Sequence, residues 1–397
     1  MPAHENQHYV QKKLINNFAR QCKNGKYKVC LLDLNKFTAE YRNTDSIFYA
    51  KNIYDVNNDD IKALEKKLNE KIEVPGFNLI ERLVSNSSTD IQINRKELLL
   101  IKKYFLIQQY RNLKNMSLYS HPPKDKALLS DCSIKNDESV LDFWKREITT
   151  ILDADTDADW KALLGNKDMV GIKINAQIIH SSFLMFFSTD YEFVLNDSGP
   201  LTERVPMYSL KLDKNDFMKT AKEISKLYFG VDNISDKVFE NAYRMREDEG
   251  GMLFDTIMFT PMSSNLLIAF VSPLWKYSQE LYSPILSKYL SFPQNTYVNE
   301  RQIYASLDKM TQEEALIKFA SPNDRYNYKV QKLNESETIY LNTLIMNEAY
   351  QYICFKTPSQ TVKDLIREYN KLDGLKNVKH NYKGFIDLIN VLPPFDV

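Results

Sequence analysis

The feature that most constrains the fold is a long apolar segment, ELLLIKKYFLIQQYRNL, which runs from Glu97 to Leu113. Leucine, isoleucine and aromatic residues would cover most of the circumference of this segment if it were a helix. A helix that is apolar nearly all round belongs inside a protein rather than on its surface. We therefore predict a central helix from Arg95 to about Leu113, with the other elements packed around it.

The rest of the chain combines helical patterns with short β-rich segments and has few turn residues. The 10 Gly and 14 Pro punctuate it only sparsely. The patterns predict helices at 10–20, 213–228, 234–246, 334–352 and 359–371, and two or three more within 137–186. A further helix is predicted at 59–84, with a break at Pro75-Gly76. Strands are predicted at 26–34, near 37–43 and at 192–197, and a hairpin-like pair at 254–260 and 266–272.

These elements indicate an α+β fold, with a mainly helical body around a small, mostly antiparallel sheet. No internal repeat, low-complexity tract or clear linker interrupts the sequence. We expect a single domain over 1–397. The alternative is a pair of interlocked lobes, with 1–130 carrying the first helix and strand, and 131–397 forming a helical lobe with the hairpin.

Composition excludes some classes of protein. The 24 Tyr and 21 Phe argue against disorder, and a net charge of zero gives no global attraction to nucleic acid. Residues 1–120 nevertheless hold 20 Lys+Arg against 13 Asp+Glu, a difference of 20 − 13 = +7. This local excess is compatible with an anionic partner on the N-terminal half.

Neither secretion nor membrane insertion is predicted. Met1 is followed by polar and charged residues, and the longest apolar stretches, such as LLIAFV at 266–271, are too short to span a bilayer. The four cysteines (Cys22, Cys30, Cys132, Cys354) are scattered and form no C-x-x-C pair. Reduced thiols in a cytoplasmic protein without a membrane partner are therefore expected.

The most conspicuous short motif is H-E-x-x-H, formed by His4, Glu5 and His8. In a zinc protease these residues lie on a stable interior helix and are joined by a third ligand downstream. Here the motif lies at the fraying start of the chain, and no downstream extension follows. We interpret the match as a coincidence and expect no zinc site.

A second motif resembles a calcium loop. Asp153, Asp155 and Asp157 occupy its first three ligand positions, but Ala158 replaces the turn glycine and Leu164 replaces the closing glutamate. We predict no calcium site. The acidic residues are better explained as the N-terminal cap of a following helix, where they suit the helix dipole.

Three further polar residues stand in apolar surroundings. His8 precedes the first apolar segment, Arg111 ends the long apolar helix, and Asp197 closes a strand at a turn. Each has a structural alternative: His8 as a helix-entry cap, Arg111 as half of an ion pair, and Asp197 as a turn former. Tyr104 and Gln108 fall at helical spacing on the same face as Arg111.

The order of these segments resembles the bacterial family described as domain of unknown function 4238. The opening of that family, H-Y-V-P-Q-x-x-L-x-x-F, is matched by His8-Tyr9-Val10 followed by Ile15 and Phe18. Further similarities are KYKVCLLDL (26–34), DSIFYAKNIYD (45–55), the acidic helix around Glu70 and Glu73, the helix ending Gln109-Tyr110-Arg111, FVLNDSGP (193–200), FTPMSSNLLIAFVSP (259–273) and LNTLIMNEAYQYICF (341–355).

The sequence also departs from the family pattern. Gln11-Lys12 replaces the usual Pro-Gln after H-Y-V, and the turn after Asp197 carries an additional Gly199 before Pro200. The resemblance implies no settled activity. Among the histidines of the H-E-x-x-H motif, it includes only His8.

We expect His8, Arg111 and Asp197 to converge in one pocket, with Glu73 as a fourth member. The Arg111 guanidinium should lie within about 8 Å of the Asp197 carboxylate or the His8 ring, with Asp197 as the first candidate for its partner. A His for proton transfer, an Arg for an anionic oxygen and an Asp that orients the His or binds a metal suit phosphodiester cleavage.

The first hypothesis is thus a nuclease-like hydrolase, acting as a toxin or phage-defence effector. Its partner would be nucleic acid, with Mg²⁺ or Mn²⁺ as the candidate metals, or a protein of a defence system. Two alternatives remain: a non-catalytic protein-interaction module that uses these residues as a buried polar network, and a sensor that binds a small anion in the same pocket.

Overall fold

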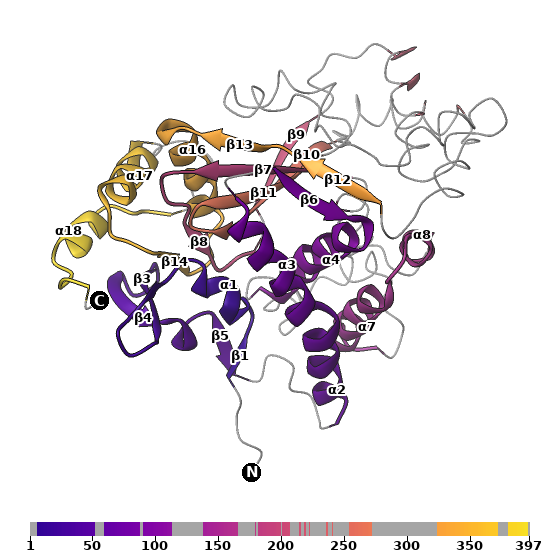
Figure 1. Ribbon diagram of the computed structural model, residues 1–397, viewed down its shortest axis with the longest axis horizontal. Helices are drawn as coiled ribbons and strands as arrows, with labels where there is room; N and C mark the ends of the chain where they lie inside the picture. The colour runs from indigo at the N-terminus through magenta and orange to yellow at the C-terminus, as the bar shows by residue number, and fades with distance from the viewer. Residues whose placement is uncertain are drawn as a thin grey trace.

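The computed structural model describes residues 6–51, 59–87, 90–112, 138–165, 182–199, 201–206, 254–271, 324–371 and 380–395, together with isolated residues at 179 and between 214 and 240. The elements confirm the expected α+β class, with mostly antiparallel sheets (Figure 1). In the described part of the chain, no helix is both long enough and apolar enough to cross a membrane.

The helix predicted as the centre of the fold is present as α4, Arg95–Arg111. It starts with a reciprocal cap, in which the Asn94 side chain accepts the Glu97 N–H and the Glu97 carboxylate accepts the Asn94 N–H, each at 2.9 Å. Eleven of its residues are buried, including Lys102 and Lys103. The interpretation of this segment as an interior helix is confirmed.

A five-stranded sheet lies against this helix. Its strand order is β13-β7-β11-β10-β9, and every neighbouring pair is antiparallel except β13 and β7. The ring of Phe105 on α4 meets Phe270 on β11 with centroids 5.6 Å apart. The strands are β7 Phe183–Thr189, β9 Leu201–Pro206, β10 Phe254–Ser263, β11 Leu266–Val271 and β13 Val330–Leu333. The predicted hairpin is β10–β11.

A second sheet brings together segments from both ends of the chain. Its order is β2-β3-β14-β8, with β4 paired to β3. Two ribbons, β1–β5 and β6–β12, accompany it. The bounds are β1 Asn6–His8, β2 Arg20–Gln21, β3 Tyr27–Asp33, β4 Thr38–Asn43, β5 Tyr49–Lys51, β6 Ile91–Asn94, β8 Leu195–Asn196, β12 Arg325–Tyr328 and β14 Tyr352–Phe355.

The helix predicted for 59–84 is interrupted at a different position from the one expected. The helices α2 (Asp59–Leu68) and α3 (Val74–Ser85) are joined by a π-helical turn, η2 (Asn69–Glu73). The predicted break at Pro75-Gly76 is wrong, because both residues lie within α3 and the irregular turn comes directly before them.

Several other boundaries differ from the sequence prediction. The first helix, α1, is confined to Lys12–Asn16, and the region 137–186 contains α7 (Val140–Asp153), α8 (Asp157–Gly165) and the start of β7. The helix predicted for 334–352 ends early, as α16 (Glu335–Asn347), and gives way to β14. The helices α17 (Gln360–Lys371) and α18 (Phe385–Asn390) follow, while the predicted helices at 213–228 and 234–246 fall almost wholly outside the described residues.

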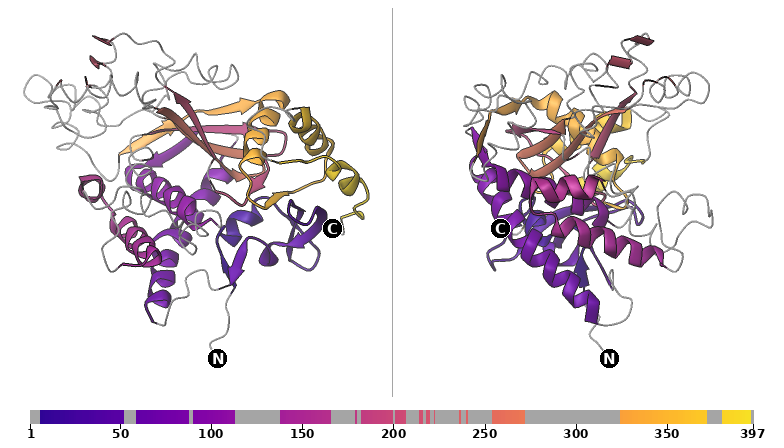
Figure 2. Two further views of the ribbon diagram at one scale, coloured as in Figure 1. Left: turned by 180° about the vertical axis from the view of Figure 1, so that it is seen from behind. Right: turned by 90° about the vertical axis from the view of Figure 1, so that its right-hand side faces the viewer.

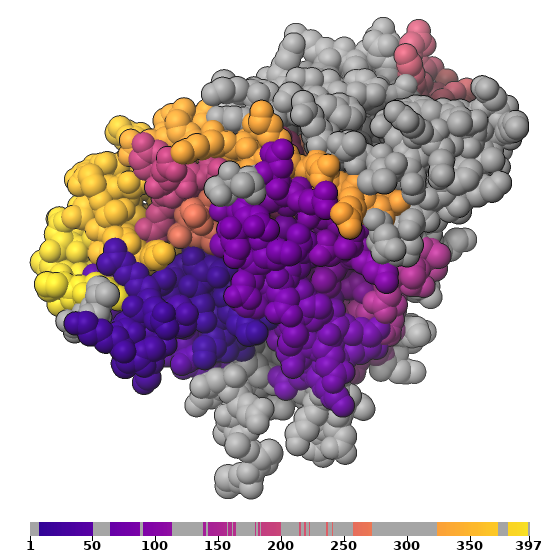
Figure 3. Space-filling model, in the orientation of Figure 1, coloured from indigo at the N-terminus to yellow at the C-terminus, as the bar shows by residue number. Residues whose placement is uncertain are grey.

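Most of the helices form two groups. Helices α2, α3, α4 and α7 gather on one side of the molecule, and α16, α17 and α18 gather at another, beyond the sheets (Figures 1 and 2). The surface of the segment before residue 51 adjoins that of α2–α4 in the space-filling view (Figure 3). The beginning of the chain therefore lies directly against the central helical group.

The contact between α3 and α4 requires a glycine. A Cβ on Gly76 would lie 2.5 Å from Cδ2 of Tyr104, a distance that forces the ring to move. We predict that Gly76→Ala lowers the unfolding free energy by about 1–3 kcal/mol through overpacking, despite the better helix propensity of alanine. Chemical denaturation measures the change. Asn78→Ala, at an exposed position of α3, is the control and should not destabilise the protein; equal stability of both variants would contradict the close contact.

Candidate functional site

His8 lies at the end of β1, opposite Tyr49 of β5. The two rings meet edge to face, with centroids 6.1 Å apart. The residue before Tyr49, Phe48, has a φ of +53°, which is strained for an aromatic residue, and its carbonyl accepts the N–H of Tyr9 at 3.0 Å. Strained backbone of this kind clusters at functional sites. His8 and Tyr9 are thus both attached to the segment Phe48–Tyr49, the first by strand pairing and the second by a backbone hydrogen bond.

The surroundings of the His8 ring favour its neutral form. Burial, followed by the charge of Lys12, lowers the pKa of His8, while Asp45, a hydrogen bond with the Ile47 backbone and Glu73 oppose that shift. Because the pKa falls below its ordinary value of 6.5, the ring is mostly neutral at pH 7. Its Nδ1 atom is buried and has no hydrogen-bond partner among the described residues.

Arg111 reaches the same place from the end of α4. Its Nη1 pairs with the carboxylate of Glu73, and its Nη2 donates to the His8 carbonyl at 3.0 Å. The Arg111 side chain is 7% exposed and the Glu73 side chain is 23% exposed. Glu73 is the last residue of the π-helical turn η2, and such turns frequently mark functional sites.

Three amide and hydroxyl side chains hold this cluster together. Gln11 donates from Nε2 to the Glu73 carbonyl and accepts the Tyr104 hydroxyl at Oε1, both at 2.9 Å. Gln108 donates from Nε2 to the Tyr9 carbonyl at 2.6 Å. These bonds join the segment after His8 to η2 and to α4. We call His8, Gln11, Glu73, Tyr104, Gln108 and Arg111 the His8 cluster.

Asp197 follows β8 and has a different role in the structure. Its carboxylate is fully buried and accepts the backbone N–H groups of Tyr350 and Gln351 at 2.8 and 2.9 Å. Burial raises the pKa of Asp197 to about 6, against the opposing effect of these hydrogen bonds. The carboxylate found with Arg111 is that of Glu73, whereas Asp197 holds the start of β14.

The turn that carries Asp197 still lies next to the His8 cluster. Gly199 has a φ of +83°, and a Cβ there would come within 3.5 Å of the Gln108 carbonyl and the Asn112 side chain. The charge of Asp197 also contributes to raising the pKa of Tyr9. Of the four predicted site residues, His8, Arg111 and Glu73 therefore form one cluster, and Asp197 occupies a neighbouring turn.

Sequence reasoning missed Gln11 as a member of this cluster. It also assigned no role to Tyr104 and Gln108, although it placed them on the Arg111 face of the helix. Their common signal was a row of polar groups on an otherwise apolar helix. Gln11 had a weaker signal, because it stands where the related family usually has proline.

The H-E-x-x-H motif and the calcium-like loop can now be compared with the structure. His4 and Glu5 lie outside the described residues. Asp153 pairs with Lys67 and Lys71, and Asp155 pairs with Lys71 and Lys103. The helix cap of α8 is made by Thr156 and Asp159, since the Thr156 hydroxyl accepts the Asp159 N–H and the Asp159 carboxylate accepts the Thr156 N–H. The predicted cap is therefore present, and the acidic residue that forms it is Asp159, directly before Trp160, together with Thr156.

No group of three or more His, Cys, Asp or Glu side chains in the described part of the chain is arranged to hold a metal ion. Cys22, Cys30 and Cys354 are buried and free, and Cys132 lies outside the described residues.

We predict that calcium does not bind at Asp153 and Asp155. Their carboxylates are already neutralised by lysines, and the loop lacks its turn glycine and closing glutamate. Isothermal titration calorimetry with micromolar calcium should show no heat of specific binding. A stoichiometric isotherm that Asp155→Ala abolishes would overturn this prediction.

The raised pKa of Asp197 predicts a pH dependence of stability. Because the folded state binds this proton more tightly than the unfolded state, the contribution of Asp197 to the unfolding free energy should fall as pH rises from about 4 to about 6. The size of the fall is roughly 3 kcal/mol, from 1.36 kcal/mol per unit of pKa. Urea denaturation of the wild type and of Asp197→Asn across this pH range measures the unfolding free energy of each protein. The difference between the two values isolates the contribution of Asp197, because the other titrating groups are the same in both proteins. A constant difference would contradict the assigned pKa.

One of three comparisons with known proteins identifies a family. No curated protein and no solved structure matches the chain. A family model described as "Protein of unknown function (DUF4238)" matches residues 6–359, a region that includes every residue of the His8 cluster and the Asp197 turn. The chain therefore belongs to the DUF4238 family.

Proposed function

We propose that this protein is a nuclease-like hydrolase that acts on phosphodiesters in the cytoplasm, as a toxin or phage-defence effector. The observation that carries the proposal is the meeting of His8, Glu73 and Arg111 from three separate elements. Proton transfer and stabilisation of an anion are the two requirements of phosphodiester cleavage that side chains supply. The neutral imidazole of His8 and the buried guanidinium that binds the His8 carbonyl could supply both.

In this mechanism His8 accepts a proton from a water molecule that attacks phosphorus. The bond to the leaving oxygen then breaks, and that oxygen takes a proton from solvent. Arg111 interacts with the negative charge on the non-bridging oxygens, because a guanidinium is always charged and has five N–H donors in a fixed plane. Glu73 positions the guanidinium through their ion pair.

The charge distribution of the chain supports a nucleic acid as substrate. The His8 cluster belongs to the N-terminal 120 residues, which carry the excess of lysine and arginine. Lys12 and Lys13 directly follow Gln11 on α1; the first pairs with Asp45, and the second lies 4.8 Å above the Phe77 ring. Such cations attract a phosphate backbone irrespective of its base sequence.

A second candidate function, a non-catalytic module, is favoured by the contacts of Arg111. Two of its nitrogens bind acceptors within the chain, the Glu73 carboxylate and the His8 carbonyl. In this case the His8 cluster is a structural network that anchors the beginning of the chain, and the function lies in recruiting a protein partner or a small anion.

Cleavage assays on the full-length protein test the first proposal. Labelled DNA and RNA are incubated with wild type, His8→Ala and Arg111→Ala, without metal and with Mg²⁺ or Mn²⁺. We expect cleavage by the wild type and a loss of about 10²–10⁴-fold in rate in His8→Ala, the typical contribution of general acid–base catalysis. The control is His4→Ala, which alters the other histidine of the H-E-x-x-H motif and should cleave normally.

Thermal and urea unfolding of the same proteins distinguishes the two candidates. If the cluster is catalytic, His8→Ala keeps most of its stability while it loses activity. If the cluster is structural, no substrate is cleaved, and Arg111→Ala loses on the order of 3–5 kcal/mol because Glu73 is left without its partner. Equal loss of activity in His4→Ala and His8→Ala, with stoichiometric zinc in the protein, would instead support a metalloprotease.

A further inference from the structure

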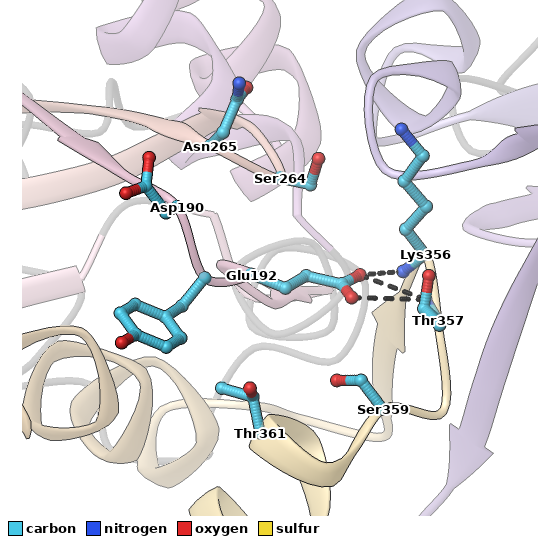
Figure 4. A pocket seen from close by; sticks show the side chains of 9 residues that line it. Asp190, Glu192, Ser264, Asn265, Lys356, Thr357, Ser359 and Thr361 are labelled. Atoms are coloured by element: carbon cyan, nitrogen blue, oxygen red, sulfur yellow. Dashed lines mark hydrogen bonds between the residues drawn. The ribbon is translucent and has the colours of Figure 1, made fainter. Parts of the chain in front are cut away.

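A separate pocket lies away from the His8 cluster, between three loops (Figure 4). The first loop joins β7 to β8, the second is the tip of the β10–β11 hairpin, and the third joins β14 to α17. The pocket has a volume of about 310 Å³. This volume lies at the lower end of the range of small-molecule sites, roughly 300–1,000 Å³.

Glu192 extends across this pocket from the first loop to the third (Figure 4). Its carboxylate accepts the backbone N–H groups of Lys356 and Thr357. Burial raises the pKa of Glu192 to about 7, while those hydrogen bonds and the charges of Lys356 and Arg20 oppose the shift. Arg20 also donates to the Thr357 hydroxyl at 2.8 Å. The carboxylate is therefore fixed in position.

Both carboxylates at the pocket already have partners. Glu192 accepts the backbone N–H groups of Lys356 and Thr357, and Asp190, the other carboxylate of the lining, forms an ion pair with Lys332 at 2.6 Å. A cationic ligand would have to displace one of these partners, so the carboxylates do not require a cation.

Hydroxyl groups make up much of the remaining lining. Ser264 and Thr361 contribute hydroxyls for which the structure gives no hydrogen bond to a described residue. Ser359 adds a hydroxyl from the loop before α17, and its oxygen accepts the Val362 N–H at 3.3 Å. Tyr191 also lines the pocket. Hydroxyls that both donate and accept, together with a fixed carboxylate, match a ring with several hydroxyl groups.

We propose that this pocket binds a neutral ligand with vicinal hydroxyl groups, of the size of a monosaccharide or of the ribose of a nucleoside. Glu192 accepts hydrogen bonds from the ligand hydroxyls, and Ser264 at the hairpin tip and Thr361 at the start of α17 complete the set. The site is independent of the proposed phosphodiester cleavage, because it shares no residue with the His8 cluster.

Saturation-transfer NMR on the full-length protein tests this site with four probes: D-glucose, D-ribose, adenosine and 2′-deoxyadenosine. We expect at least one hydroxylated probe to bind with a dissociation constant of about 1 mM or better, as a small ligand in a preformed pocket can reach. Preference for glucose indicates a sugar site. Binding of adenosine but not of 2′-deoxyadenosine indicates recognition of ribose.

Two variants test whether the probe binds in this pocket. Thr361→Val and Ser264→Ala each remove one hydroxyl and should weaken binding by about two- to tenfold, the typical effect of one hydrogen bond. Thr150→Val, on α7 and outside the pocket, is the matched control and should bind like the wild type. No binding of any probe at about 10 mM, unchanged affinity in both pocket variants, or displacement of the probe by inorganic phosphate at lower concentration would overturn the proposal.

Discussion

The arrangement of the N-terminal half depends on one requirement, the neutralisation of a guanidinium at the end of a buried helix. Arg111 cannot lose its charge, and an unpaired buried charge costs several kcal/mol. Glu73 supplies the counter-charge from the π-helical turn, and the His8 carbonyl supplies a second acceptor. The guanidinium therefore joins three segments that are far apart in sequence, and it fixes the backbone of His8 without engaging the imidazole ring.

The fold could be predicted where one physical pattern dominates a segment. The apolar circumference of 95–111 required an interior helix, and the paired apolar runs around Ser263-Ser264-Asn265 required a hairpin. The break in 59–84 could not be predicted in the same way. Proline is tolerated in a first helical turn, and the π-helical turn before it is accompanied by a bond from Gln11 to its last carbonyl, a contact formed only in the folded protein.

The same distinction applies to the candidate site. The face shared by Tyr104, Gln108 and Arg111 follows from helical spacing alone, and these side chains do reach one cluster. The choice between Glu73 and Asp197 as the partner of Arg111 did not follow from the sequence, because it depends on where α3 packs. Asp197 instead meets two N–H groups of a segment more than 150 positions later, and no local pattern encodes that contact.

Two carboxylates, one buried and one half-buried, bind the backbone on either side of β14 in the second sheet. Asp197 accepts the amides of Tyr350 and Gln351 just before this strand, and Glu192 accepts those of Lys356 and Thr357 just after it. Both carboxylates come from the short segment around β8, which itself pairs with β14. Burial raises the pKa of each.

This segment also connects the two sites that we describe. Its first end, at Glu192, lines the hydroxyl-rich pocket, and its other end continues into the Gly199 turn against the end of α4. A ligand that contacts Glu192 would therefore meet a segment that is hydrogen-bonded to the chain just before and just after β14. The same short segment lines the pocket at Glu192 and packs beside the end of α4 at Gly199, although the two sites share no residue.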